Sequence, residues 1–172
     1  MAKIGLFYGS NTGKTEMVSY LIKEEFDKID PSLVEVHNIG SSTPEQMLKY
    51  EFLIFGIPTW NTGQMQDDWE NFLPQLKKMD FNGKKVALFG LGDQNGYGFN
   101  FLDALGMLAD RVMERGADVY GLWPTQGYEF EESKARLEEF FLGLGVDEDG
   151  QAEQTKTRVA KWVQDVKQEF GI

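Results

Sequence analysis

A polar loop near the N-terminus has the residue types and the spacing of a phosphate-binding site. It reads Gly9-Ser10-Asn11-Thr12-Gly13-Lys14-Thr15 and directly follows an apolar stretch, Lys3–Tyr8. Its hydroxyl and amide side chains can donate hydrogen bonds, and the start of the helix expected after it favours an anion. The ATP-binding loop has four residues between its glycines, whereas three separate Gly9 from Gly13. We therefore expect one terminal phosphate group here. The simpler alternative is a polar turn that caps a helix.

Two further loops carry aromatic residues that have no obvious core to fill. One loop reads Pro58-Thr59-Trp60-Asn61-Thr62-Gly63-Gln64, and the other runs from Gly90 to Asn100 with Tyr97 between two glycines. Glycine lets backbone amides approach a ligand closely, and aromatic rings can cover a flat ligand. The alternatives are that Trp60 caps the end of a sheet and that Tyr97 is a surface residue of a long turn.

The elements that position these loops alternate between strand and helix. Short apolar runs predict buried strands at 3–8, 33–38, 52–57, 85–90 and 117–123. Periodic apolar residues predict helices at 13–29, 67–76, 100–115 and 155–170, and Thr43-Pro44 marks the start of a shorter one. This order predicts one α/β domain, residues 1–172, with a doubly wound five-stranded parallel sheet and helices on both faces. The interruption between Trp123 and Thr155 predicts an excursion within or beside the last strand.

The three loops should meet at one edge of that sheet. Ligands of open α/β sheets bind at the carboxyl ends of the strands, and the loops follow the strands that end near Tyr8, Ile57 and Gly90. The ligand they imply has a phosphate, a spacer and a flat aromatic head that lies between two rings. Flavin mononucleotide (FMN) has that shape.

Composition excludes several other classes of site. The chain has 172 residues, no cysteine, one histidine (His37) and a net charge of −11. Disulfides, iron–sulfur clusters, thiol catalysis and the usual zinc sites are therefore excluded, and we expect no metal site. His37 lies away from the three loops, so we expect a surface residue and not a ligand. The negative charge disfavours nucleic acid and favours either solubility alone or basic protein partners. No apolar run is long enough for a membrane span and no secretory signal is visible, so we expect a cytoplasmic protein.

The sequence resembles the long-chain flavodoxins over nearly its whole length. The matching stretches include KIGLFYGSNTGKTE, IPTWNTGQMQDDWE, DFNGKKVALFGLGDQNGYG, FLDALGML and LGVDEDGQ. Within the family it looks closest to the second flavodoxin of enteric-type bacteria. The resemblance implies strand order 2-1-3-4-5 and an excursion that corresponds to the long-chain insertion. It differs from the usual family pattern at Thr62, where a bulky residue is common, and in the stretch FFLGLGVDEDGQ.

The family pattern implies FMN as cofactor and a role for each matching residue. The implied FMN-binding residues are Ser10, Asn11, Thr12, Gly13, Lys14, Thr15, Pro58, Thr59, Trp60, Asn61, Thr62, Gly63, Gly92, Asp93, Tyr97 and Asn100. Residues 10–15 would hold the phosphate, and Thr59 the ribityl chain. Trp60 and Tyr97 would cover the inner and outer faces of the flavin, and residues 92, 93 and 100 would meet its pyrimidine edge. The peptide that joins Asn61 to Thr62 would turn its carbonyl toward the flavin on reduction.

The resemblance implies a monomeric, low-potential one-electron carrier and not an enzyme. It would dock on the basic face of a ferredoxin/flavodoxin-NADP reductase and then on low-potential acceptor enzymes, through acidic residues near 67–70 and 129–132. The alternative is a two-electron, FMN-dependent quinone reductase with the same fold. An ATPase, a phosphorelay receiver and a serine hydrolase all fail on the loop residues. The ATP loop has the wrong spacing, and positions 9–10 and 58–59 lack the acidic residues of a receiver. No Gly-x-Ser-x-Gly motif is present.

Overall fold

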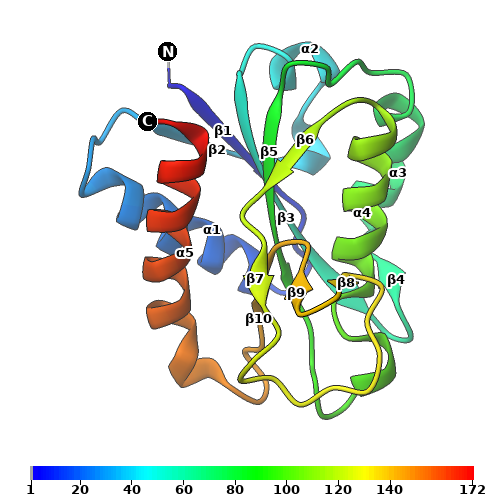
Figure 1. The fold of residues 1–172 in the computed structure, drawn as a ribbon. Coiled ribbons are helices and arrows are strands. Elements are labelled where there is room, and N and C mark those ends of the chain that lie inside the picture. Colours follow the sequence, from blue (N-terminus) through cyan, green and yellow to red (C-terminus); the bar gives the residue numbers. More distant parts are fainter. Residues whose placement is uncertain (1) are drawn as a thin grey trace.

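The computed structural model describes residues 2–172 and is built on a central parallel sheet with helices on both faces (Figure 1). The strands of this sheet are β1 (Ile4–Tyr8), β2 (Val34–Asn38), β3 (Phe52–Trp60), β5 (Lys85–Leu91), β6 (Asp118–Tyr120) and β10 (Leu144–Val146). They lie in the order β2-β1-β3-β5, and both β6 and β10 pair with β5. The predicted order 2-1-3-4-5 is therefore confirmed, with β5 as the fourth strand and β6 and β10 sharing the fifth position.

The excursion divides the fifth strand in two. In β6, Asp118 pairs with Lys85 of β5, which lies 33 positions earlier in the chain. In β10, Leu144 pairs with Phe89 of β5, which lies 55 positions earlier. The difference of 22 residues is the length of the excursion. It holds a small antiparallel sheet of β7 (Trp123–Pro124), β9 (Phe140–Phe141) and β8 (Arg136–Leu137).

The predicted strand at 117–123 is wrong in its second half. Strand β6 ends at Tyr120, and Gly121 has a φ of 75°. This left-handed conformation turns the chain out of the sheet, and glycine adopts it without steric cost. The Gly121 carbonyl accepts a hydrogen bond of 2.8 Å from the Trp162 indole, which is fully buried. The exit of the excursion is thus fixed by a contact to the last helix, which sequence periodicity does not report.

Two layers of helices cover the sheet. Helices α1 (Lys14–Asp27) and α5 (Thr155–Phe170) pack side by side on one face, and their apolar residues share a core with β1 and β10. Helices α3 (Asp67–Leu76) and α4 (Asp103–Glu114) cover the other face, with Trp69 and Leu105 in its core (Figure 1). The remaining elements are α2 (Pro44–Met47), the hairpin strand β4 (Gln64–Met65) and the short 3₁₀ turns η1 (Ile39–Ser41), η2 (Gly98–Asn100) and η3 (Ala152–Gln154).

Two predicted boundaries move in ways that matter for the loops. The strand expected at 52–57 continues to Trp60, because β4 pairs with Thr59 and Trp60 as a hairpin. The helix expected from Asn100 begins at Asp103, after η2 and after Leu102, which has a φ of 58°. The first change attaches Trp60 to a hairpin, whereas the second lengthens the connection between Tyr97 and α4 and places η2 within it.

His37 is half-buried, so the prediction of a surface residue is wrong. Its ring stacks on Phe7 with 4.8 Å between centroids. Its two nitrogens lie 2.8 Å from the Tyr50 hydroxyl and 3.0 Å from the Gln46 amide nitrogen. None of these partners belongs to the three loops. The alternation of polar and apolar residues in this strand predicts that one face of β2 is open to solvent. In the structure, Tyr50 packs over that face.

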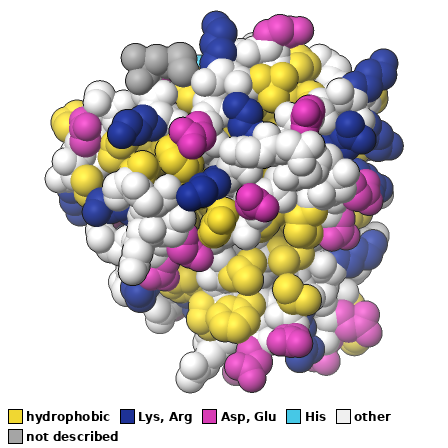
Figure 2. Space-filling model, turned by 45° about the horizontal axis from the view of Figure 1, so that its top comes forward, with side chains coloured by type: hydrophobic (Ala, Val, Ile, Leu, Met, Phe, Trp, Pro, Cys, Tyr) yellow, Lys and Arg dark blue, Asp and Glu magenta, His cyan; other side chains and the backbone are white. Residues whose placement is uncertain are grey.

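The surface carries both signs of charge. The face in Figure 2 shows lysine and arginine side chains interspersed with aspartate and glutamate, and hydrophobic side chains gather in its lower half. Despite the net charge of −11, the acidic side chains therefore do not form a continuous patch on this face. Within residues 2–172, none of the helices is long and apolar enough to cross a membrane.

Candidate functional site

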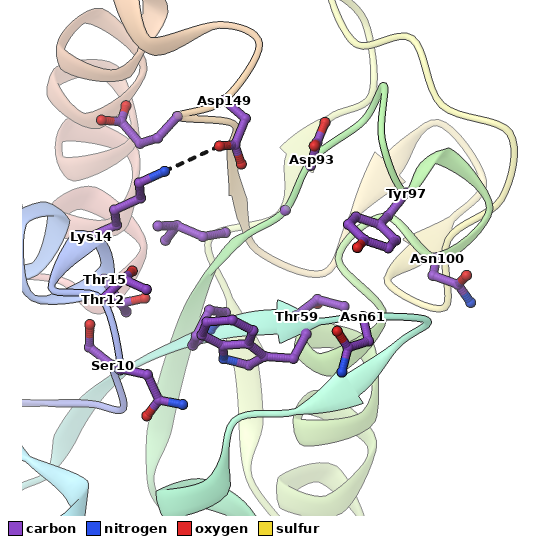
Figure 3. Close-up of a pocket in the computed structure, with 16 residues that line it drawn as sticks. Ser10, Thr12, Lys14, Thr15, Thr59, Asn61, Asp93, Tyr97, Asn100 and Asp149 are labelled. Carbon is purple, nitrogen blue, oxygen red and sulfur yellow. Dashed lines mark hydrogen bonds and ion pairs between the residues drawn. The ribbon is translucent and has the colours of Figure 1, made fainter.

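A cavity of about 340 Å³ opens at the carboxyl ends of β1, β3 and β5. Its lining comprises Ser10, Asn11, Thr12, Lys14, Thr15, Pro58, Thr59, Trp60, Asn61, Leu91, Gly92, Asp93, Tyr97, Asn100, Glu148 and Asp149. The loop that begins at Ser10 lies on one side, and Tyr97 and Asn100 lie on the other (Figure 3). The three loops thus meet at one edge of the sheet, as their positions after the strands predicted.

The first loop presents backbone amides to the cavity. Gly13 is the N-cap of α1 with a φ of 86°, and in the described chain α1 has no side-chain cap. The N–H groups of its first turn therefore have no partner within the helix. A Cβ atom at position 13 would meet nothing within 4 Å, so the φ value and not space requires the glycine. Ser10 Oγ accepts from Gly13 N at 2.9 Å and closes the loop. An anion is the chemistry that this arrangement favours.

Helix α3 holds the first loop in place through one buried side chain. Gln66 is fully buried at the N-cap of α3, where its Oε1 accepts from Asp68 N at 3.1 Å and Trp69 N at 3.2 Å. Its Nε2 donates to Asn11 Oδ1 at 2.9 Å. Gln66 is not among the residues predicted from the sequence. Its position one residue before a predicted helix is the signal that was available.

The second loop is a hairpin whose tip is fixed by hydrogen bonds. Thr59 pairs with Met65 and Trp60 with Gln64, and the Asn61 amide donates to Gln64 Oε1 at 3.0 Å. Asn61 has a φ of 48°, in the left-handed region that asparagine tolerates better than most residues. Thr59 Oγ1 accepts from Ala104 N at 3.0 Å, so the hydroxyl also caps the start of α4.

The indole N–H of Trp60 is buried and has no hydrogen-bond partner anywhere in residues 2–172. No other side-chain nitrogen or oxygen in the described chain is in this state. A buried donor without a partner costs free energy, typically about 1–3 kcal/mol. A ligand with acceptor atoms in the cavity would remove that cost.

The third loop is held by two aspartates. Asp93 Oδ1 accepts from Asn95 N at 3.1 Å and Gly96 N at 2.8 Å, which closes a turn before Tyr97. Asn100 Nδ2 donates to Asp103 Oδ2 at 3.0 Å. The other oxygen of this buried carboxylate accepts from Lys134 N at 2.8 Å, so the excursion supports the loop. Tyr97 stands at the rim of the cavity with 46% of its surface exposed.

The structure adds three residues to the predicted set and leaves three outside the cavity. Leu91, Glu148 and Asp149 line it although they were not predicted. The acidic run that begins at Asp147 was visible in the sequence, but we assigned it to the excursion. Pairing of β10 beside the end of β5 brings it to the cavity. The predicted residues that do not line the cavity are Gly13, Thr62 and Gly63.

The titratable groups beside the first loop do not form an acid–base pair. Burial and a hydrogen bond to Glu16 raise the pKa of Tyr8 above its usual range. The Tyr8 hydroxyl therefore remains a neutral donor and holds Glu16 in the first turn of α1. Amides, hydroxyls and aromatic rings dominate the cavity, which is the composition of a binding site for an anionic, partly aromatic ligand.

Comparisons with known proteins agree with this geometry. Residues 6–162 match the family model described as Flavodoxin. The chain is 45% identical over 172 residues to a flavodoxin of Synechococcus elongatus, covering all of both chains. It is 46% identical over 173 residues to Flavodoxin 1 of Escherichia coli, covering all of this chain and 97% of the relative.

A solved structure extends the agreement to three dimensions. The crystal structure of Fusobacterium nucleatum flavodoxin bound to flavin mononucleotide superposes with a TM-score of 0.91 at 32% identity. The match covers 98% of this chain and 99% of that one. The chain therefore belongs to the flavodoxins, a family of electron-transfer carriers and not of enzymes.

Proposed function

We propose that residues 1–172 form a single-domain, monomeric, cytoplasmic carrier that holds FMN in the cavity. It takes electrons from an NADPH-dependent flavoprotein reductase and delivers them to low-potential acceptor enzymes. The observation that carries the proposal is the cavity itself, in which an uncapped helix start faces two aromatic rings across one edge of the sheet. A phosphate, a spacer and a flat ring system are the ligand parts that these walls fit.

The residues present fit FMN on three independent counts. The amides of residues 10–15 and the start of α1 suit a phosphate. The buried Trp60 N–H has no acceptor among the described residues, and the phosphate or the ribityl hydroxyls of FMN would supply one. The cavity volume of about 340 Å³ lies within the range of small-molecule sites. Trp60 and Tyr97 are the two rings available to cover the flavin.

FMN, when bound, supplies the redox chemistry by accepting and releasing electrons. The chain binds and orients it. In our proposal the amides and hydroxyls of residues 10–15 hold the phosphate, and the Thr59 hydroxyl, which accepts from Ala104, directs its own proton to the ribityl chain. Residues 92, 93 and 100 meet the pyrimidine edge. The carbonyl of Asn61 reorients toward the flavin, because Asn61 (φ 48°) tolerates unusual backbone angles and Gly63 (φ 98°) gives freedom on the far side of Thr62.

Acidic residues beside the cavity support docking on a basic partner. Asp67, Asp68 and Glu70 stand in the first turn of α3, next to the hairpin that carries Trp60. Glu129 and Glu131 line a shallow depression with Tyr97. We infer that these two groups face the basic surface of a ferredoxin/flavodoxin-NADP reductase and, in turn, of the acceptors. Charges so placed raise the association rate at low salt.

We also infer from the loop motifs that the chain stands closest, within its family, to the second flavodoxin of enteric-type bacteria. The stretches GIPTW and GLGDQNGYG carry this inference. The relative from Escherichia coli reported above is named Flavodoxin 1. The appropriate test is therefore whether this chain can functionally replace the first or the second enteric flavodoxin.

A stepwise anaerobic reduction of the purified protein, followed by visible absorption, tests the proposal. We expect an oxidised flavin spectrum and then a long-wavelength band that rises and falls as electrons are added one at a time. Direct bleaching without that band would favour the quinone-reductase alternative. Failure of the protein to bind added FMN would overturn the proposed site itself.

Docking on the reductase is tested by a separate measurement. We expect reduction by NADPH and a flavodoxin-NADP reductase to slow as salt rises from about 0.01 M to 0.15 M, because screening shortens the reach of the charges. The double variant Asp67→Asn/Glu70→Gln should lose most of this salt dependence, whereas Asp110→Asn on the exposed side of α4 should keep it. Equal salt dependence in all three proteins would contradict docking through α3.

A further inference from the structure

The cavity contains one cation among several carboxylates. Among the described residues that line it, Lys14 is the single basic side chain, whereas Asp93, Glu148 and Asp149 are acidic. Lys14 Nζ lies 3.2 Å from Asp149 Oδ1, and Figure 3 shows this ion pair between the start of α1 and the loop after β10. Lys14 is therefore already paired on the side of the cavity where a phosphate would bind.

The loop that carries the two acidic residues opposite Lys14 is anchored by buried hydrogen bonds. Asp149 follows Asp147, a fully buried carboxylate whose Oδ1 accepts from Asp149 N at 3.1 Å and from Gly150 N at 2.8 Å. Glu148 accepts a hydrogen bond from the hydroxyl of Thr155, itself a buried residue. The loop backbone and the Glu148 carboxylate are thus held beside the cavity, and the Asp149 carboxylate, 54% exposed, is paired with Lys14.

Fixed carboxylates beside a phosphate site create an electrostatic conflict. A phosphomonoester carries a charge of about −1.5 to −2 at neutral pH, and like charges at close range disfavour binding. The chain can resolve the conflict if Lys14 neutralises the acidic side while the loop amides hold the phosphate. Lys14 would then act without contacting the phosphate at all.

We propose that Lys14 is a positioning residue that serves as the counter-ion of Asp149 and, at longer range, of Glu148. This role differs from that of direct phosphate ligand, which the family resemblance implied. The inference rests on the proposed binding of FMN in this cavity. It assigns to Lys14 the removal of an electrostatic penalty that the carboxylates would impose on phosphorylated flavin and not on riboflavin, which lacks the phosphate charge.

A double-mutant cycle tests the pair. The flavin is removed from the purified protein, and FMN and riboflavin are each titrated by quenching of flavin fluorescence. We expect Lys14→Met to weaken FMN binding about tenfold and to leave riboflavin binding unchanged. Asp149→Asn should leave FMN binding equal or tighter, and Lys14→Met/Asp149→Asn should recover most of the loss. The control Lys28→Met removes an exposed ion pair at the far end of the same helix and should change neither affinity.

The outcomes separate this inference from the proposed function. If Lys14→Met and the double variant lose FMN affinity equally, Lys14 binds the phosphate directly and the inference is wrong. It is also wrong if Lys14→Met has no effect. If the unchanged protein binds neither flavin, the proposed function fails instead. Circular dichroism and the urea midpoint of each variant establish that a loss of affinity is not a loss of folding.

Discussion

The two aromatic residues of the cavity differ in how firmly they are held. Trp60 belongs to the β3–β4 hairpin, and its indole nitrogen is buried. Tyr97 lies in the third loop, just after the turn that Asp93 closes, and nearly half of its surface is exposed. A rigid inner ring and a more exposed outer ring would let a ligand enter from the side of Tyr97. At the scale of single residues, Trp60 should therefore carry more of the binding energy.

Replacement of Trp60 separates stacking from hydrogen bonding. Trp60→Ala should weaken FMN binding by about 1–3 kcal/mol, the usual value of a stacked ring, or roughly fivefold to 150-fold. Trp60→Phe keeps a ring but lacks the N–H, so we expect a smaller loss, about 0.5–1.5 kcal/mol. Fluorescence titration measures both variants. An affinity of Trp60→Ala equal to that of the unchanged protein would contradict the stacking role.

Substitutions of Thr62 test the mobility of the peptide that joins it to Asn61. Thr62 is exposed, but its β-branched side chain restricts the backbone. Thr62→Gly should raise the fraction of protein that accumulates at the one-electron-reduced stage, measured as the maximum of the long-wavelength band. Thr62→Ala is the matched control, because it removes the branch and keeps most of the backbone restriction. Equal maxima in Thr62→Gly and the unchanged protein would rule out a role for this peptide.

At the scale of elements, one buried carboxylate joins the parts of the chain that surround the cavity. Besides the loop after β10, Asp147 accepts from Gln94 N at 3.2 Å and Gln94 Nε2 at 2.7 Å. Gln94 Oε1 in turn accepts from Glu129 N at 2.5 Å. The third loop, the excursion and the end of β10 are thus tied to a single side chain, which has four N–H donors to satisfy its charge.

Asp147→Asn should destabilise the fold and the cavity together. An amide cannot accept from all four donors, and a lost hydrogen bond to a charged group costs about 1.5–3 kcal/mol. We expect a fall in melting temperature of about 2–4 °C for each kcal/mol. Asp149→Asn in the same loop serves as control and should change stability by less than about 0.5 kcal/mol, since its ion pair is exposed. Equal melting temperatures of the two variants would show that the Asp147 contacts contribute little.

At the scale of the whole molecule, the titratable residues His37, Glu35 and Tyr50 form a cluster away from the cavity. Burial lowers the pKa of His37, although Glu35 partly opposes this effect. Hydrogen bonds from Ala2 N and Tyr50 lower the pKa of Glu35. Burial and the Glu35 carboxylate raise the pKa of Tyr50 to about 12, so its hydroxyl stays a donor. These residues join β2, β1 and the segment before β3 on the α3 side of the sheet.

The fold should lose stability in acid in two steps. The unfolded chain binds a proton at His37 near pH 6.5, whereas the folded chain resists it, so stability falls as pH drops below about 6.5. Glu35 is protonated more readily in the unfolded chain, which adds a second loss below about pH 4.5. His37→Gln should flatten the first step only. Urea midpoints between pH 7.5 and 5 measure it, and parallel curves for the two proteins would contradict this role of His37.

Local pattern and composition predicted most of the fold and most of the cavity. Apolar runs located the strands, because a buried parallel strand requires them on both faces. Helices α3 and α5 begin and end where their periodicity indicates. Thirteen of the sixteen residues predicted to bind FMN line the cavity. The three loops were located because ligand loops of open α/β sheets follow strand ends, which are visible in the sequence, whereas the sixteen residues themselves were implied by the family resemblance.

Contacts between distant segments decided the rest. Tyr50 covers His37 from 13 positions away, and Trp162 fixes the turn at Gly121 from 41 positions away. The pairing of β10 with β5 brings Asp149 to Lys14 across 135 positions. Sequence periodicity reports which side of an element is buried but not what buries it. The elements, the loops and the expected kind of ligand were thus determined by the sequence alone, whereas the pairing of charges around the cavity was decided only when the chain had folded.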